Sequence, residues 1–131
     1  MEGIIIKSMD YKDTSKLVTV VTENGISTLL VKGAKQYKSK NFAYSQVLTL
    51  LSYEPIKSKT FDILGSASIV DGFSNIKKDY ERTQAAYVVL EHAYQFAEHI
   101  TDTITFFRFL INILHKPASD FSRKLGPPGK M

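Results

Sequence analysis

The sequence predicts an α+β protein in which an N-terminal five-stranded β-barrel is followed by two α-helices. Two observations lead to this prediction. Five segments rich in β-branched and apolar residues crowd into the first 70 residues, at 3–8, 16–22, 26–32, 45–54 and 61–70. From about residue 79, apolar residues instead recur at the spacing of a helix. The expected organisation is a barrel domain over 1–74, a partial helical domain over 75–116 and a flexible C-terminal tail over 117–131.

The Asn24-Gly25 pair marks the best-defined turn of the predicted barrel. Both residues tolerate the positive φ of a type I′ turn, so the second and third strands are expected to form a hairpin. Residues 33–41 show no periodicity and are expected to form a loop, and Pro55 is expected to help end the fourth strand. A barrel of this size fits an OB-type fold, and an SH3-like barrel is the competing topology.

Two helices are predicted in the second half of the chain. The first covers residues 79–100 and carries tyrosines every seven residues on a stripe expected to pack against the barrel: Tyr80, Tyr87 and Tyr94. Thr101 or Asp102 can cap the second helix, which Pro117 stops. Apolar residues lie all around this second helix. It therefore either packs between the barrel and the first helix or has partners outside this chain.

The composition excludes several classes of protein. The chain has no cysteine, which excludes disulfides, cysteine-ligated zinc sites and thiol nucleophiles. Its N-terminus lacks the pattern of a signal peptide, and the most apolar stretch, 106–114, is too short to span a bilayer. We therefore expect a cytoplasmic protein without membrane contact.

Positive charge is concentrated in the first half of the chain. Residues 1–60 contain nine lysines and five acids, a net charge of +4, whereas residues 61–116 contain five bases and seven acids, a net charge of −2. A nucleic-acid partner for the barrel is one interpretation. An ordinary solvated, lysine-rich surface is the other.

Several segments, taken in order, resemble bacterial RecO proteins. These are residues 3–7, Asp10-Tyr11, the Asp13-Thr14-Ser15-Lys16 run, the Asn24-Gly25 hairpin, Lys32-Gly33-Ala34-Lys35, Lys38-Ser39-Lys40, Leu48-Thr49-Leu50 and the stretch from Leu64 to Phe73. The resemblance implies an N-terminal OB-fold, a helical domain and no catalysis. It also implies a mediator of DNA repair and recombination that anneals strands and loads recombinase. Family members usually continue further, so the chain is interpreted as a short or truncated member.

The predicted DNA-contacting residues lie in two segments. They are Lys12 and Lys16 in the first, and Lys32, Lys35, Tyr37, Lys38 and Lys40 in the second. Proteins that bind single strands without sequence preference combine a positive groove with aromatic rings that stack on bases. In an OB-fold both segments map near the binding face. The alternative for the second segment is an ordinary solvated turn.

No catalytic, cofactor or metal site is predicted. His92 and His99 lie seven residues apart, about 10 Å along a helix axis, which is too far for one ion. Asp10 and Asp13 can equally well pair with nearby lysines, and no catalytic grouping accompanies them. The chain is therefore predicted not to be an enzyme.

The resemblance implies three partners: single-stranded DNA, with weaker binding of duplex DNA, RecR, and the acidic tail of the single-strand-binding protein. It also implies association with the nucleoid. The competing hypothesis is a protein-interaction module that docks RecR or the single-strand-binding protein without touching DNA.

Overall fold

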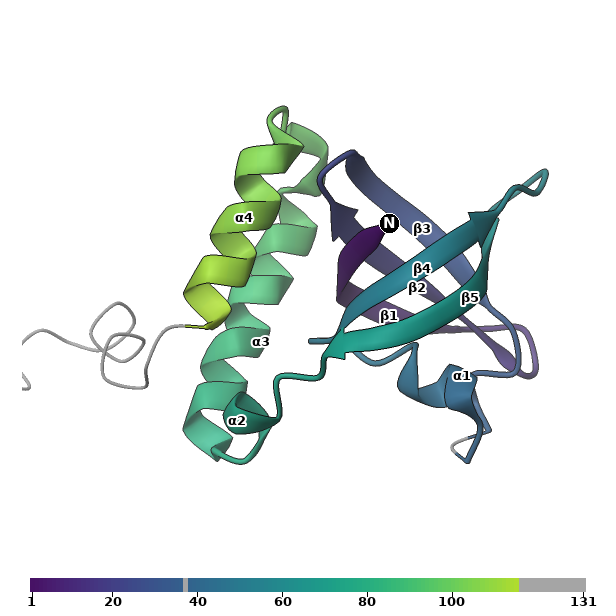
Figure 1. Cartoon of the computed structure of the whole chain (residues 1–131), viewed down its shortest axis with the longest axis horizontal. Coiled ribbons are helices and arrows are strands. Elements are labelled where there is room, and N and C mark those ends of the chain that lie inside the picture. The colour runs from purple at the N-terminus through teal and green to yellow at the C-terminus, as the bar shows by residue number, and fades with distance from the viewer. Residues whose placement is uncertain (37, 116–131) are drawn as a thin grey trace, which may run out of the picture.

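The computed structural model describes residues 1–36 and 38–115, so the predicted stop at Pro117 and the predicted tail over 117–131 lie outside the described residues. Its β-strands close into a barrel in the order β1-β2-β3-β5-β4 (Figure 1). The strands are β1 (Glu2–Tyr11), β2 (Ser15–Thr22), β3 (Gly25–Val31), β4 (Leu50–Ile56) and β5 (Asp62–Asp71). β3 and β5 pair in parallel and the other neighbours are antiparallel. The predicted fold class, an OB-type barrel followed by helices, is confirmed.

The predicted hairpin turn joins β2 to β3. Gly25 has a φ of +145°, a conformation that favours glycine. The Thr22 hydroxyl accepts a hydrogen bond from the Asn24 N–H at 3.1 Å and donates to the Gly25 carbonyl at 2.9 Å. This turn sets the register in which Val21 pairs with Ile26.

The fourth strand begins later than predicted. A short helix, α1 (Lys40–Ala43), interrupts the expected loop, because the Ser39 hydroxyl accepts the Phe42 N–H and caps it. The chain then meets β1 through backbone hydrogen bonds that join Leu48 and Thr49 to Ile5, and β4 starts only at Leu50.

Pro55 does not end β4, contrary to the sequence prediction. It pairs with Leu64 inside the strand, next to a shift in register between Tyr53 and Pro55. Such an irregularity accommodates a residue that has no N–H to donate.

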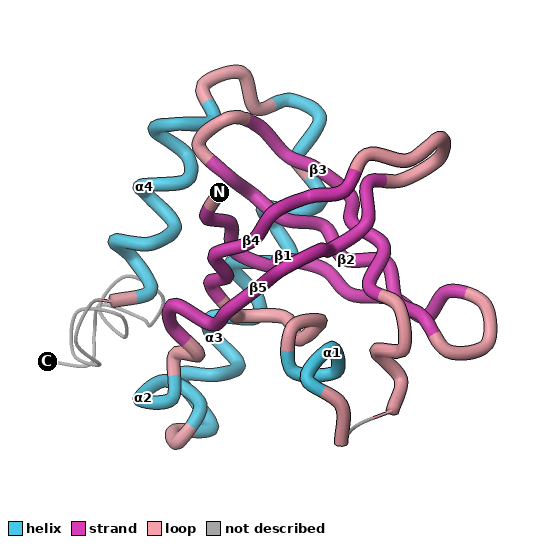
Figure 2. The backbone as a smooth tube through the Cα atoms, turned by 45° about the vertical axis from the view of Figure 1, so that its right-hand side comes forward, coloured by secondary structure: helices cyan, strands magenta, loops and turns pink. Residues whose placement is uncertain are grey.

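The helices that follow β5 lie together on one side of the barrel, apart from α1 (Figure 1). They are α2 (Ser74–Lys77), α3 (Tyr80–Gln95), the 3-10 turn η1 (Ala97–His99) and α4 (Thr103–Leu114). Asp79 and Asp102 cap the two longer helices by accepting the backbone N–H groups of Arg82 and Thr105. α3 ends at Gln95, five residues before the predicted end, and η1 turns the chain so that α4 returns alongside α3 (Figure 2).

Two buried clusters hold the described residues together. One fills the barrel and includes Ile5, Val18 and Leu51. The other joins the outer face of β1, through residues such as Ile4 and Ile6, to the inner faces of α3 and α4. The most buried helical residues of this cluster are Ala86, Leu90, Leu110 and Leu114. The second predicted helix therefore packs against both the barrel and the first helix, while Ile104 and Phe109 stay about half exposed.

The tyrosine stripe of α3 behaves differently from its prediction. Tyr94 is half-buried and packs against the cluster between barrel and helices. Tyr80 and Tyr87 are 77% and 42% exposed, so their predicted packing against the barrel is wrong. A seven-residue repeat drifts by about 20° per step around a straight helix, which carries the stripe away from a single contact face.

None of the helices among the described residues combines the length and the hydropathy that a membrane span needs.

Candidate nucleic-acid interface

The structure brings the two predicted lysine segments together at one end of the barrel. The turn between β1 and β2 contains Lys12, whose φ is +55°, and the loop after β3 lies against this turn. The Lys35 N–H donates to the Thr14 carbonyl at 3.1 Å, and the Lys35 ammonium donates to the Lys12 carbonyl at 3.3 Å. Residues that are more than twenty positions apart in sequence therefore form one surface.

Local hydrogen bonds shape the loop that carries most of these lysines. Gly33, with a φ of +67°, begins the loop in a conformation that suits glycine. Its carbonyl accepts the Ser39 hydroxyl at 3.2 Å, and the Lys32 carbonyl accepts the Asn41 amide at 2.6 Å. These contacts hold the two ends of the loop close together.

We call the lysines of these two segments the lysine surface: Lys12, Lys16, Lys32, Lys35, Lys38 and Lys40. All are exposed except Lys16, which is half-buried. Tyr37, the remaining predicted contact, lies outside the described residues. The role of this set in binding DNA stays a prediction.

Asp10 is the acid that organises the lysine surface. Its carboxylate lies 3.5 Å from the Lys16 ammonium and 3.7 Å from that of Lys35, while its side chain stays 65% exposed. Counting Asp10 and Asp13 against the six lysines leaves an excess of four positive charges. Exposed ion pairs of this kind are weak, so an incoming anion can compete for both lysines.

The turn between β4 and β5 adds residues that the sequence prediction did not include. The rings of Tyr11 and Phe61 meet edge to face with centroids 5.8 Å apart, which places this turn beside the end of β1. The turn also carries Lys57 and Lys59, of which Lys57 pairs with Asp62 at 3.1 Å. The available signal was the Lys57-Ser58-Lys59 run followed by an aromatic residue.

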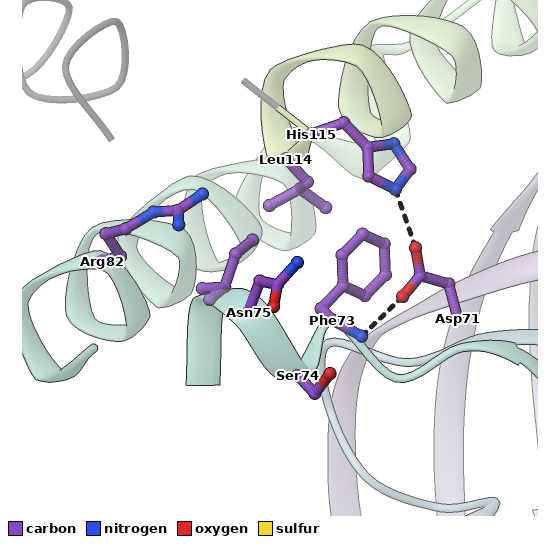
Figure 3. A pocket seen from close by; sticks show the side chains of 8 residues that line it. Asp71, Phe73, Ser74, Asn75, Arg82, Leu114 and His115 are labelled. Atoms are coloured by element: carbon purple, nitrogen blue, oxygen red, sulfur yellow. Dashed lines mark hydrogen bonds and ion pairs between the residues drawn. The ribbon is translucent and has the colours of Figure 1, made fainter. Parts of the chain in front are cut away.

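A second feature, at the junction of barrel and helices, is a pocket of about 280 Å³ (Figure 3). Asp71 accepts the Phe73 N–H at 2.7 Å, and its other oxygen lies 2.7 Å from Nε2 of His115. Burial would raise the pKa of Asp71, but these hydrogen bonds and the nearby charge of Lys77 lower it. The pair ties the end of β5 to the end of α4.

Among the described residues no group of three or more potential ligands could hold a metal ion.

Burial is the main cause that raises the pKa of Tyr53 to about 12, with a smaller effect of the Asp62 charge. Tyr53 packs in the barrel core and its hydroxyl contacts the Met1 sulfur at 3.5 Å, so this shift reflects packing.

A third feature is an apolar groove of about 310 Å³ between α3 and α4. Phe96, Phe106 and Phe109 line it, and Phe96 and Phe109 are more than half exposed. This groove lies on the helices, and residues of the lysine surface do not line it.

Comparison with known proteins shows which protein family this chain resembles. The family model described as "Recombination protein O N terminal" matches residues 1–73. The chain is similar to the "DNA repair protein RecO" of Clostridium novyi, with 31% identity over 119 residues, covering 85% of this chain and 46% of the relative. The protein of the same name from Clostridium perfringens is 38% identical over 88 residues, covering 66% and 36%. The chain thus spans less than half the length of these relatives.

Proposed function

Because the chain belongs to the RecO family, we propose that it serves in DNA repair and recombination by binding single-stranded DNA on its lysine surface. The observation that carries this proposal is the contact of Lys35 with the turn that holds Lys12, which joins two separate basic segments into one surface. The resemblance predicts how the bound strand is used: as a mediator, the protein anneals complementary strands and helps load recombinase together with RecR.

The chemistry of the surface suits a polyanion of no particular sequence. Ammonium groups contact phosphates as mobile point charges, and they carry no information about bases. Tyr11 and Phe61 offer aromatic rings beside these charges, at which unpaired bases can stack. Duplex DNA hides its base faces, so it should bind more weakly. No step here requires bond making, and the proposed role is non-enzymatic.

Charge reversal tests the proposal. The Lys35→Glu, Lys38→Glu double variant should weaken binding of labelled oligo(dT) several-fold, measured by fluorescence anisotropy at low salt. The matched control is Lys77→Glu with Lys78→Glu, which makes the same change in net charge at the end of α2, where Lys78 is the C-cap. Urea unfolding of both variants verifies that each remains folded.

The two variants separate a local site from a general charge effect. A loss confined to the loop variant supports the lysine surface as the DNA site. Equal losses in both variants, or unchanged affinity in the loop variant, would show that DNA binds elsewhere or only through net charge.

A second candidate function is a protein-docking module that contacts RecR or the single-strand-binding protein without DNA. The apolar groove between α3 and α4 favours it, because exposed apolar patches often mark protein contacts. Phe109→Ala tests this role, since the exposed ring contributes little to folding. Under this function the variant should lose binding to immobilised RecR or single-strand-binding protein and keep its affinity for oligo(dT).

A further inference from the structure

A groove of about 420 Å³ lies between β1 and α3, beside their buried contact, and next to the lysine surface. Lys16 belongs to both, since its ammonium pairs with Asp10 and its side chain lines the groove. A polyanion that follows the lysine surface can therefore continue into the groove along Lys16 and Lys7, where Glu91 is the acidic residue of the lining. The volume falls within the usual range of ligand sites.

An irregularity in β1 directs a second lysine into this groove. The register of β1 against β2 shifts between Ile5 and Lys7, so two adjacent side chains face the helices. Ile6 packs in the cluster shared with α3, and Lys7 reaches over the Tyr94 ring at 5.1 Å. The bulge thus turns the Lys7 side chain toward α3, whereas the regular alternation of a strand would have pointed it into the barrel.

The carboxylates that pair with Lys7 and Lys16 lie far enough from the two ammonium groups for a phosphate to replace them. The Lys7 ammonium lies 4.0 Å from Glu91, and that of Lys16 lies 3.5 Å from Asp10. Both side chains are shielded, at 34% and 22% exposure, which weakens their solvation relative to a lysine in open water. A phosphate held between them would gain two charge-assisted contacts.

Polar and aromatic groups complete the groove. Ser8 contributes a buried hydroxyl that has no hydrogen-bond partner among the described residues. On the opposite wall, Tyr87 is the aromatic residue that lines the groove, and its side chain remains 42% exposed.

We propose that this groove takes one nucleotide of a bound single strand, with a phosphate between Lys7 and Lys16 and the base against Tyr87. This inference rests on the proposed function and deepens it. It extends the path of the strand from the end of the barrel to the first long helix, so α3 becomes part of the DNA site.

The chain contains no tryptophan, which permits a clean spectroscopic test. Tyr87→Trp places the sole indole at the wall of the groove, and Tyr80→Trp places it seven residues earlier on α3, at a 77% exposed position that does not line the groove. Each full-length variant is titrated with oligo(dT) and with an abasic oligomer of equal length, while anisotropy of the labelled DNA reports binding independently.

Stacking predicts that oligo(dT) quenches the Tyr87→Trp emission with the same midpoint as the anisotropy change, and that the Tyr80→Trp control is not quenched. The abasic oligomer should bind without quenching. Binding by anisotropy with no selective quenching would overturn the groove assignment and leave the proposed function standing. Absence of binding to the unmodified protein would overturn both.

A second pair of variants tests the same stacking contact without a tryptophan, so the proposal stays testable even when a tryptophan variant misfolds. Tyr87→Ala should weaken oligo(dT) binding about fivefold or more, as expected for the loss of one stacked base. Tyr87→Phe keeps the ring and should restore the affinity. If alanine and phenylalanine at this position bind alike, Tyr87 does not stack on a base.

Discussion

Replacing Asp10 by asparagine should make the protein bind single-stranded DNA more tightly. Asp10→Asn keeps the shape of the side chain and removes the one negative charge that pairs with both Lys16 and Lys35. A variant that improves binding is informative, because damage to the fold seldom produces a gain. The carboxylate is 65% exposed, and each exposed ion pair contributes only about 0–1 kcal/mol, so the fold should be kept.

The size of the gain follows from the positions of the two ammonium groups. A phosphate bound to either lysine would lie roughly 6 Å from the Asp10 carboxylate, a repulsion of about 0.7 kcal/mol in water. Screening at about 0.1 M salt nearly halves this value. Removing the repulsion from two phosphates therefore gains about 0.8 kcal/mol, or about fourfold in affinity.

Anisotropy titration with labelled oligo(dT) measures this change. Glu98→Gln is the matched control, since it removes one negative charge from η1 and should leave affinity nearly unaltered. The gain should also shrink as salt is raised, because the repulsion is screened. Unchanged or weaker binding by folded Asp10→Asn would refute the placement of phosphates on Lys16 and Lys35.

Three further predictions concern stability, measured as urea unfolding midpoints. The pKa of Asp71 is lowered in the folded state, so the ionised carboxylate stabilises the fold at a pH above its unfolded-state pKa near about 3.9. This stabilisation is lost as the pH falls through the lowered folded-state pKa, and His115→Ala should flatten this acid dependence. Gly65→Ala should destabilise by about 1–3 kcal/mol, because its Cβ would meet a β4 carbonyl oxygen at 2.7 Å, whereas Gly72→Ala, with 4.0 Å of clearance, serves as the mild control. Leu110→Ala should cost about 2–5 kcal/mol, and a cost below about 1 kcal/mol would contradict the packing of α4 on the barrel and α3.

The parts of the fold that were predictable from sequence depend on local chemistry. The Asn24-Gly25 turn determines its own hairpin, and Asp79 and Asp102 cap their helices through contacts within three residues. The start of β4 was not predictable in this way. It depends on backbone hydrogen bonds between Leu48 and Ile5, which are 43 positions apart.

In the candidate site, too, local sequence predicts some features and only the folded chain shows the others. The lysine distribution and the expected OB-fold grouped Lys12 and Lys16 with residues 32–40, but the contact of Lys35 with the turn at Lys12 required the folded barrel. The groove beside α3 was hidden from sequence analysis for the same reason, since Ser8 and Tyr87 come from distant segments. The seven-residue repeat of tyrosines predicted that all three rings pack against the barrel, whereas the packing of α3 leaves Tyr80 and Tyr87 exposed.

The salt dependence of oligo(dT) binding tests the central proposal most directly. Each phosphate contact in a single strand should contribute about −0.7 to the slope of log affinity against log salt concentration. If about four of the lysines on the lysine surface contact phosphates, the slope should be near −3 and should become shallower in the Lys35→Glu, Lys38→Glu variant. Folded protein that does not bind oligo(dT) at low salt, or binds it with an affinity independent of salt, would contradict a DNA-binding role for this surface.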